Sequence, residues 1–403
     1  MRVAVLTIGN ELLSGKTVNT NASWISNILS SEGASINRHL TIPDEKEAII
    51  DGLDLLFKSK IDLIVCTGGL GPTDDDITRE VVFDYFGSEE VFDDSYWNYL
   101  SDKFLNAGYE LFESSKSQAI IPNNGDIIPN DLGSARGLLY KKNNTTLMVL
   151  PGVPMEMKGM VSHSIIPWVK NKIVSKIYSV NLRTTGVPES VLFEKVKKID
   201  FNSEYLNVGY YPSLYGVDLR ISHTDKKLLD QFRNLVYQSI NKYIYTVGNE
   251  SIEYVLVSEL LNQRLTISTA ESCTGGLIGN RLTNVPGSSE IYYGGLITYS
   301  NQSKKNDLDV SAKSIQDFGA VSKEVALQMA KNIRAKFKTN IGVSVTGIAG
   351  PGGGTDLKPV GLVYVGYCDE NILKVKKFNF TSNRESNKIR TSQAVFNFIL
   401  SMI

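Results

Sequence analysis

The chain of 403 residues is long enough for two or three domains of about 150 residues each. Its 42 basic and 43 acidic residues give a formal net charge of −1, so neither nucleic acid nor an anionic membrane is expected as a partner. No stretch approaches the roughly 20 apolar residues that span a bilayer, and the N-terminus has only a short apolar run, so we expect no membrane span and no signal peptide. The three cysteines lie far apart, which argues against a disulfide framework or a cysteine zinc site and predicts a cytoplasmic location.

Residues 1–171 are predicted to form a parallel α/β domain. Short β-rich runs at 2–9, 61–69 and 146–152 alternate with segments of helical spacing, which is the rhythm of such a domain. Residues 92–118 are aromatic and polar with helical spacing, and they predict a helical excursion from the sheet.

The rest of the chain divides into two further predicted segments. Residues 172–250 read as strand, turn, helix, two short strands and a second helix, which predicts a small α+β connector. Residues 251–403 begin with a helix at 251–263 and a strand at 265–272, and they predict a second α/β domain.

A glycine-rich turn follows the strand at 61–69. In "CTGGLGPTDDDITREVV" the strand ends, the chain turns through glycines, and a helix is expected to begin with Thr73 or Asp74 as its N-cap. Backbone N–H groups at such a corner bind anions, but the carboxylates of Asp74, Asp75 and Asp76 would repel a bare phosphate. A divalent cation between carboxylates and phosphate would remove this conflict; the alternative is that the aspartates only cap the helix.

Polar residues also follow other strands of this domain. The carboxyl ends of parallel strands meet at one edge of an open sheet, so we expect these residues to form one site. The predicted ligand-binding residues of this N-terminal site are Glu11, Asn19, Asp44, Gly68, Gly69, Gly71, Thr73 and Lys158. The predicted metal ligands are Asp74, Asp76 and Glu156.

Two adjacent nucleophiles, Ser272 and Cys273, stand at a strand-to-helix turn in "ESCTGG". Residues 224–403 contain no histidine, so this segment supplies no imidazole to activate either of them. A lysine with a lowered pKa is the next candidate base, and "TYSNQSKKN" supplies Lys304 and Lys305. A thiol rarely needs so strong a base, which favours a Ser–Lys pair and leaves the cysteine as apolar filling. The alternative for the serine is that it caps the following helix.

The glycine-rich corner "TGIAGPGGGTD" (346–356) is expected to face the same cleft, where its N–H groups would hold a phosphate or orient the substrate. The alternative is a flexible connection. For a phosphate, the last helix offers Arg384, Lys388 and Arg390, while Glu271 either orients the lysine or is an exposed acid. The predicted catalytic residues are Ser272, Lys304, Tyr299 and Thr274. The predicted substrate-binding residues are Glu271, Gly275, Gly276, Thr346, Gly347, Gly350, Gly352 and Arg390.

Long motifs at both ends of the chain carry a family resemblance. "TIGNELLSGKTVNTNA", "GGLGPTDDDITRE" and "LPGVPMEM" resemble the molybdopterin-binding-type domain of the CinA (competence/damage-inducible) family. "TAESCTGGLIG", "GGLITYSNQSK" and "SVTGIAGPGGG" resemble its C-terminal domain, which also occurs alone as nicotinamide-nucleotide amidase. The resemblance implies an α/β fold class: a three-layer αβα molybdopterin-binding-like domain over 1–171, a KH-like α+β connector over 172–250, and an αβα amidase domain over 251–403.

The resemblance also implies activities. The C-terminal domain would hydrolyse nicotinamide mononucleotide to nicotinate mononucleotide and ammonia without a cofactor, with Ser272 as nucleophile and Lys304, rather than Lys305, as base. The N-terminal domain of some members resembles an ADP-ribose pyrophosphatase; here it would use a divalent metal, with or without a monovalent cation, and place Asp44 and Asp76 at its nucleotide site. Small-molecule nucleotides and a second copy of the chain are the expected partners. The alternative is a non-catalytic protein that binds nucleotides or pterins, linked to competence or DNA damage.

Overall fold

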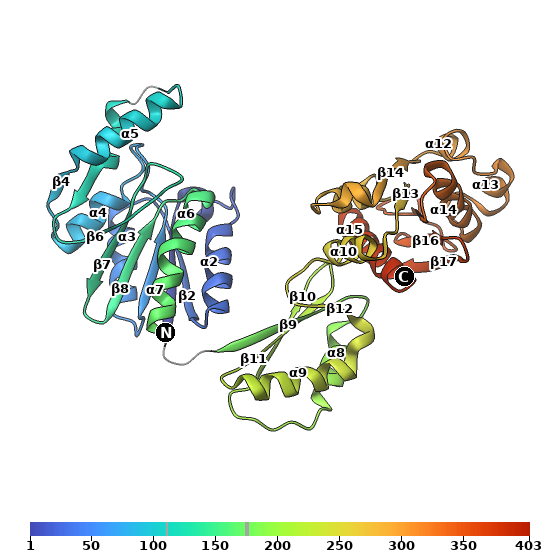
Figure 1. Ribbon diagram of the computed structural model, residues 1–403, viewed down its shortest axis with the longest axis horizontal. Coiled ribbons are helices and arrows are strands. Elements are labelled where there is room, and N and C mark those ends of the chain that lie inside the picture. Colours follow the sequence, from blue (N-terminus) through green and yellow to red (C-terminus); the bar gives the residue numbers. More distant parts are fainter. Residues whose placement is uncertain (110–111, 174–176) are drawn as a thin grey trace. The chain divides into compact units, whose positions relative to one another are not determined.

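The structure, a computed structural model, describes residues 1–109, 112–173 and 177–403. It forms two compact units, Met1–Tyr178 and Ser179–Ile403 (Figure 1). The α/β fold class is confirmed, whereas the predicted boundaries at 171/172 and 250/251 stay predictions. In the part of the chain that the structure describes, no helix is long and apolar enough to cross a bilayer.

The first unit is a three-layer αβα sandwich around a six-stranded sheet in the order β2-β1-β3-β8-β7-β6. The first four of these strands are parallel, and β7 is antiparallel to both of its neighbours, β8 and β6. All residues of β3 and β8 are buried, as expected where helices cover both faces of a sheet. The strands are β1 (Arg2–Ile8), β2 (Ser35–Ile42), β3 (Leu63–Thr67), β6 (Asp126–Ile128), β7 (Gly137–Lys142) and β8 (Thr145–Leu150).

Two separate hydrophobic cores lie on the two faces of this sheet. On one face the core includes residues of α3 (Lys46–Phe57) and α4 (Thr78–Phe86). On the other face it includes residues of α2 (Thr20–Ser31), α6 (Pro154–Met160) and α7 (Ile166–Lys172). A short helix, α1 (Asn10–Leu13), follows β1.

The predicted helical excursion is present as α5 (Asp94–Asn106) and a 3₁₀ turn over Glu113–Ala119, and the part of this prediction that covers 110–111 lies outside the described residues. A two-stranded sheet of β4 (Glu90–Phe92) and β5 (Ile120–Pro122) flanks it.

The predicted start of the helix after the glycine turn is wrong. Helix α4 begins at Thr78, and neither Thr73 nor Asp74 caps it. The aspartates instead form a turn of their own, in which the N–H of Asp76 donates to the carbonyl of Thr73 and the carboxylate of Asp76 accepts from the N–H of Thr73 at 3.1 Å. The carboxylate of Asp76 and the carbonyl of Thr73 therefore accept hydrogen bonds within this turn rather than from the first turn of a helix.

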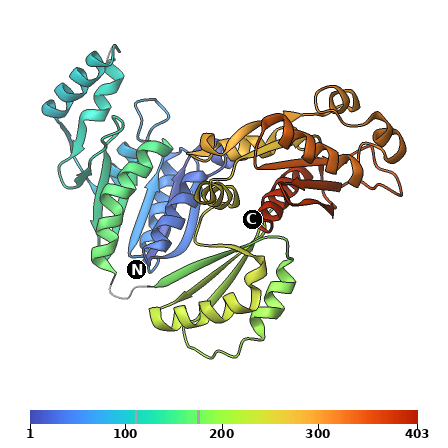
Figure 2. The same cartoon turned by 45° about the vertical axis from the view of Figure 1, so that its right-hand side comes forward.

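The second unit contains two sheets. The smaller has four strands in the order β10-β11-β9-β12, and α8 (Glu189–Lys197) and α9 (Lys226–Ile240) cover one of its sides (Figures 1 and 2). This is the predicted α+β arrangement. Its strands are β9 (Tyr178–Thr184), β10 (Asn207–Pro212), β11 (Val217–His223) and β12 (Ile244–Val247).

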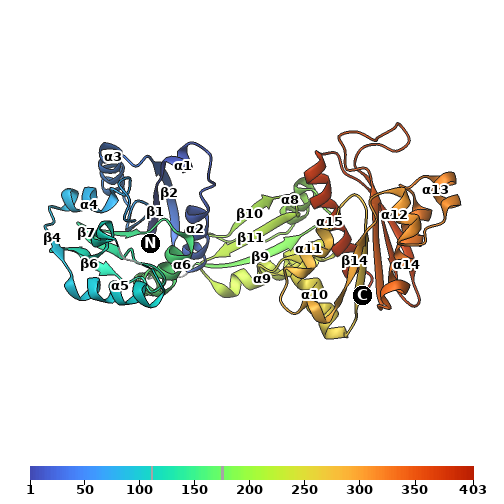
Figure 3. The same ribbon diagram turned by 90° about the horizontal axis from the view of Figure 1, so that it is seen from above.

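The larger sheet of the second unit has five strands in the order β14-β13-β15-β16-β17, with β13, β14 and β15 parallel. Figure 3 shows α10, α11 and α15 on one side of it and α12, α13 and α14 on the other. Its strands are β13 (Ile267–Glu271), β14 (Tyr292–Ile297), β15 (Ile341–Gly347), β16 (Leu362–Cys368) and β17 (Leu373–Asn379). Its helices are α10 (Ile252–Gln263), α11 (Leu277–Thr283), α12 (Asn301–Asn306), α13 (Ala312–Phe318), α14 (Lys323–Phe337) and α15 (Arg384–Leu400).

Candidate active site

Ser272 lies in the turn between β13 and α11, at the carboxyl end of a central parallel strand. Its N–H donates to the carbonyl of Val345 at 3.0 Å, so the turn begins in register with β15. Gly275 and Gly276 then have φ angles of 61° and 94°, in the left-handed region that favours glycine. Helix α11 begins only at Leu277, and its N-cap residue is Gly276. Ser272 therefore does not cap this helix, and its hydroxyl is available for another role.

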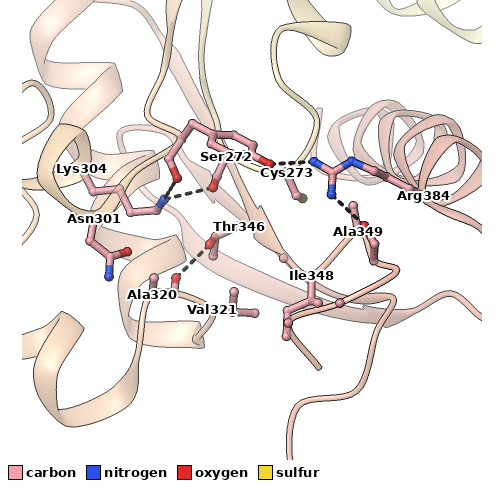
Figure 4. Close-up of a pocket in the computed structure, with 15 residues that line it drawn as sticks. Ser272, Cys273, Asn301, Lys304, Ala320, Val321, Thr346, Ile348, Ala349 and Arg384 are labelled. Carbon is pink, nitrogen blue, oxygen red and sulfur yellow. Dashed lines mark hydrogen bonds between the residues drawn. The ribbon is translucent and has the colours of Figure 1, made fainter. Parts of the chain in front are cut away.

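Lys304 reaches Ser272 from the short helix α12. This helix begins after Ser300, whose hydroxyl accepts the N–H of Ser303 at 3.0 Å. The Nζ atom of Lys304 lies 3.0 Å from Ser272 Oγ (Figure 4). It donates to the carbonyl of Thr298 at 2.8 Å. It also donates to the carbonyl of Tyr299 at 3.3 Å. The predicted nucleophile and the predicted base are thus in direct hydrogen-bond contact.

The surroundings of Lys304 favour its neutral form. The side chain is 1% exposed, and among the described residues no carboxylate forms an ion pair with it. Burial lowers the pKa of Lys304 below the usual range for lysine. A neutral amine has two N–H groups for the carbonyls of Thr298 and Tyr299 and one lone pair for the hydroxyl proton of Ser272. This is the arrangement that a general base requires.

Cys273 differs from Ser272 in both packing and acidity. It belongs to the hydrophobic core beneath the sheet, although it also lines the pocket described below. Burial raises the pKa of its thiol to about 12, so almost no thiolate is present at neutral pH. These observations fit its interpretation as apolar filling.

A pocket of about 250 Å³ opens in front of Ser272 and Lys304. Of the predicted residues, its lining includes Ser272, Lys304, Tyr299, Thr346, Gly347, Gly350 and Gly352. The lining does not include Thr274, Glu271, Gly275, Gly276 or Arg390. The glycine-rich corner therefore does face the nucleophile.

Arg384 is the basic residue of α15 that lines this pocket. Its guanidinium donates to the carbonyl of Gly350 at 2.8 Å and to the hydroxyl of Tyr299 at 2.6 Å. Arg390, six residues further along, is exposed and points elsewhere, because six residues correspond to about one and two-thirds helical turns. Lys388 lies nearer, with Nζ 3.9 Å from the position that a Cβ on Gly275 would take.

Backbone donors beside the nucleophile are free. In residues 177–403 of the described chain, no acceptor is found for the N–H groups of Cys273 and Thr274. Thr346 is less available, because its hydroxyl donates to the carbonyl of Ala320 at 2.8 Å. Free N–H groups next to a nucleophile are what a developing oxyanion needs.

The first unit has a second, smaller pocket of about 140 Å³ at the carboxyl ends of β1 and β3. Of the predicted residues it includes Glu11, Asn19 and Gly68. Asn19 caps α2 by accepting the N–H of Ala22 and donates to the hydroxyl of Thr7 at 2.9 Å. The other predicted residues of this site, Asp44, Gly69, Gly71, Thr73, Asp74, Asp76, Glu156 and Lys158, are not among its lining.

Four carboxylates of the first unit, those of Asp44, Glu11, Asp75 and Asp76, lie close enough for their charges to interact, and Glu156 is not one of them. Burial raises the pKa of Asp44, and the charges of Glu11, Asp75 and Asp76 add to this shift. Glu156 is held apart, since it accepts a hydrogen bond from the Asn130 amide at 2.6 Å.

Across residues 1–109, 112–173 and 177–403, no three His, Cys, Asp or Glu side chains are grouped so as to hold a metal ion. The predicted ligands Asp74, Asp76 and Glu156 therefore do not form a ligand set as they stand. The metal-dependent activity stays a prediction.

Comparison with known proteins gives matches over nearly the whole chain. Residues 4–171 match the model described as "Probable molybdopterin binding domain", and residues 249–403 match "CinA C-terminal domain". A protein of Clostridium acetobutylicum, named as a competence-damage inducible protein, is 38% identical over 99% of this chain and 98% of its own length. One of Caldicellulosiruptor saccharolyticus with the same name is 36% identical over 100% of this chain and 99% of its own. The crystal structure of a competence/damage inducible protein from Agrobacterium tumefaciens has 35% identity and a TM-score of 0.37, over 38% of this chain and 96% of that one.

Proposed function

The chain belongs to the CinA family of competence-damage inducible proteins, and from that premise we propose that residues 251–403 hydrolyse the carboxamide of nicotinamide mononucleotide. The products are nicotinate mononucleotide and ammonia. One observation carries the proposal: a buried lysine, which forms no ion pair with a carboxylate among the described residues, lies 3.0 Å from the hydroxyl of a serine that lines a pocket.

Acylation uses the Ser272–Lys304 pair. The serine oxygen attacks the carboxamide carbon while the amine of Lys304 takes the hydroxyl proton. The negative charge that develops on the carbonyl oxygen is stabilised by the N–H group of Cys273, which lines the pocket and has no other acceptor in this part of the described chain. The tetrahedral intermediate then collapses, the C–N bond breaks, and Lys304 returns the proton to the leaving nitrogen, which departs as ammonia.

Deacylation repeats the same chemistry with water. Lys304 is neutral again after ammonia leaves, so it removes a proton from a water molecule that attacks the ester carbon. Collapse of this second intermediate breaks the bond to Ser272 Oγ, and Lys304 returns the proton to that oxygen. The carboxylate product leaves, and neither step calls for a metal ion.

Arg384 is the residue proposed to bind the phosphate of the substrate. Apart from Lys304 it is the only basic side chain in the pocket lining, and that lining contains no acidic side chain. A guanidinium binds a phosphate through two parallel N–H···O hydrogen bonds. In the structure these donors contact Tyr299 and the carbonyl of Gly350, which also line the pocket, so the guanidinium lies beside it.

The test is ammonia release by the full-length protein from nicotinamide mononucleotide, nicotinamide riboside and nicotinamide, each with and without EDTA. We expect release from the mononucleotide, weaker release from the riboside, and no effect of EDTA. Tight binding of the mononucleotide without ammonia would contradict the proposal and would favour the non-catalytic alternative.

A further inference from the structure

Glu271, the last residue of β13, is a buried carboxylate without an ion-pair partner in the second unit as described. It is 2% exposed. Its Oε2 accepts the N–H groups of Gly276 and Ile278 at 3.0 and 3.1 Å, and its Oε1 accepts the N–H of Gly279 at 2.9 Å. These donors belong to the first turn of α11, whose N–H groups have no acceptor within the helix. Backbone donors alone therefore compensate the buried carboxylate.

These contacts close the turn that carries the nucleophile. Ser272 is fixed at one end, where its N–H donates to Val345 on β15. The other end, at Gly276, is fixed by the carboxylate of Glu271. Because Gly275 and Gly276 are glycines with left-handed φ angles, the turn has little intrinsic rigidity, and this side chain ties its two ends together.

The backbone of Glu271 is connected to the proposed base, Lys304, through Thr298. The carbonyl of Glu271 accepts the N–H of Thr298 at 2.8 Å. The carbonyl of Thr298 in turn accepts a hydrogen bond from Lys304 Nζ at 2.8 Å. One residue is thus connected to the nucleophile through its side chain and to the base through its main chain.

Resting on the proposed reaction, we infer that Glu271 is a positioning residue. Its carboxylate holds the turn so that Ser272 Oγ stays within reach of Lys304 and the N–H group of Cys273 stays free for the oxyanion. It does not line the pocket, so it neither binds the substrate nor is an exposed acid, which were roles expected from the sequence.

A carboxylate suits this role better than an amide. Both oxygens of Glu271 accept hydrogen bonds, and together they serve three N–H donors. In Glu271→Gln one oxygen becomes an NH₂ group, which places a donor against a backbone donor. Either Gly279, or both Gly276 and Ile278, then lose their acceptor, so the contact between this side chain and the turn is weakened while the side chain keeps its size.

Glu271→Gln is tested in the full-length protein beside the matched control Glu253→Gln. Glu253 accepts from Arg281 of α11 at 2.6 Å, so its variant disturbs the other end of the same helix without touching the turn. We expect E271Q to lower kcat for ammonia release about 30-fold or more and to leave KM within about threefold. For E253Q we expect kcat within about twofold of the wild type. The rate at which a fluorophosphonate labels Ser272 should fall in E271Q by a factor similar to that for kcat.

The labelling rate needs no nicotinamide nucleotide, so it separates the two proposals. If the wild type releases no ammonia, the proposed substrate is wrong, while the labelling rates of E271Q and E253Q still test Glu271. An unchanged kcat and labelling rate in E271Q would overturn the positioning role. A raised KM with unchanged kcat would also overturn it, because that pattern belongs to a substrate-binding residue.

Folding is checked by thermal unfolding. If E271Q does not unfold cooperatively, Glu271→Asp replaces it, since the shorter carboxylate keeps its charge but withdraws from α11; the same kcat-specific loss is expected. If neither variant unfolds cooperatively, Glu271 serves the fold rather than the alignment of Ser272, and the inference is overturned.

Discussion

Replacing Lys304 with methionine removes the proposed base and keeps a long side chain in its buried place. In the wild-type chain, Nζ lies 3.0 Å from Ser272 Oγ, and K304M leaves this hydroxyl without a proton acceptor. General-base catalysis contributes about 10²–10⁴-fold to a rate. We therefore expect kcat for ammonia release to fall about 10³-fold, which corresponds to about 4 kcal/mol of transition-state stabilisation.

The same substitution should change stability far less than activity. The carbonyls of Thr298 and Tyr299 each lose a donor, at a cost of about 1 kcal/mol apiece. Removal of a buried amine, whose charged form is penalised by desolvation, offsets part of this cost. The free energy of unfolding of K304M should therefore differ from that of the wild type by no more than about 2 kcal/mol.

Ammonia release and denaturant unfolding are measured on K304M and on the matched control Lys305→Met. Lys305 follows Lys304 in α12 but does not line the pocket, so K305M should keep its kcat within about twofold of the wild type. The reasoning would be refuted if K304M kept more than about a tenth of the wild-type kcat, since general-base catalysis is worth at least about 10²-fold. Equal losses in K304M and K305M would also refute it.

Three further results are expected. Because only neutral Lys304 accepts the proton, kcat/KM should rise with pH up to the lowered pKa of this residue and then level off, and a rate that falls over this range would contradict the assignment. At pH values between the lowered pKa of folded Lys304 and the ordinary pKa of lysine, the unfolded chain binds more protons at this residue than the folded chain. The free energy of unfolding of the wild type, relative to that of K304M, should therefore rise with pH in this range, and denaturant titrations at several pH values measure it. Arg384→Ala should raise KM for nicotinamide mononucleotide about 10- to 100-fold and leave KM for nicotinamide riboside, which lacks the phosphate, nearly unchanged. Arg390→Ala should change neither KM, and equal effects of R384A on both substrates would argue against phosphate binding.

The residues alone pointed to a Ser–Lys pair, and the family resemblance selected Ser272 and Lys304 for it; the structure brings these two to hydrogen-bond distance. The signal from the residues was chemical, namely that residues 224–403 have no histidine, which made a lysine the next candidate base. This signal did not depend on the local conformation of the base, which lies on the short helix α12 after β14. A side chain as long as that of lysine reaches the serine from either a strand or a helix.

Two other roles were beyond reach of the sequence, because each depends on a direction in space. Arg384 and Arg390 share one helix, and the choice between them requires knowing which face of α15 meets the glycine-rich corner. Glu271 turns its carboxylate back to α11, five to eight residues along the chain, so its burial depends on how tightly the intervening turn closes. The surroundings of the acidic residues of the first unit were beyond reach of the sequence for a related reason, since Asp76 bonds within its own turn and Asn130 donates to Glu156.

Ammonia release from nicotinamide mononucleotide by Ser272→Ala, measured beside Cys273→Ala, tests the central claim most directly. The two residues are neighbours in one turn, but only Ser272 contacts Lys304. We expect S272A to lose at least about 10³-fold in kcat and C273A to stay within about threefold of the wild type. Full activity in S272A together with its loss in C273A would contradict the account.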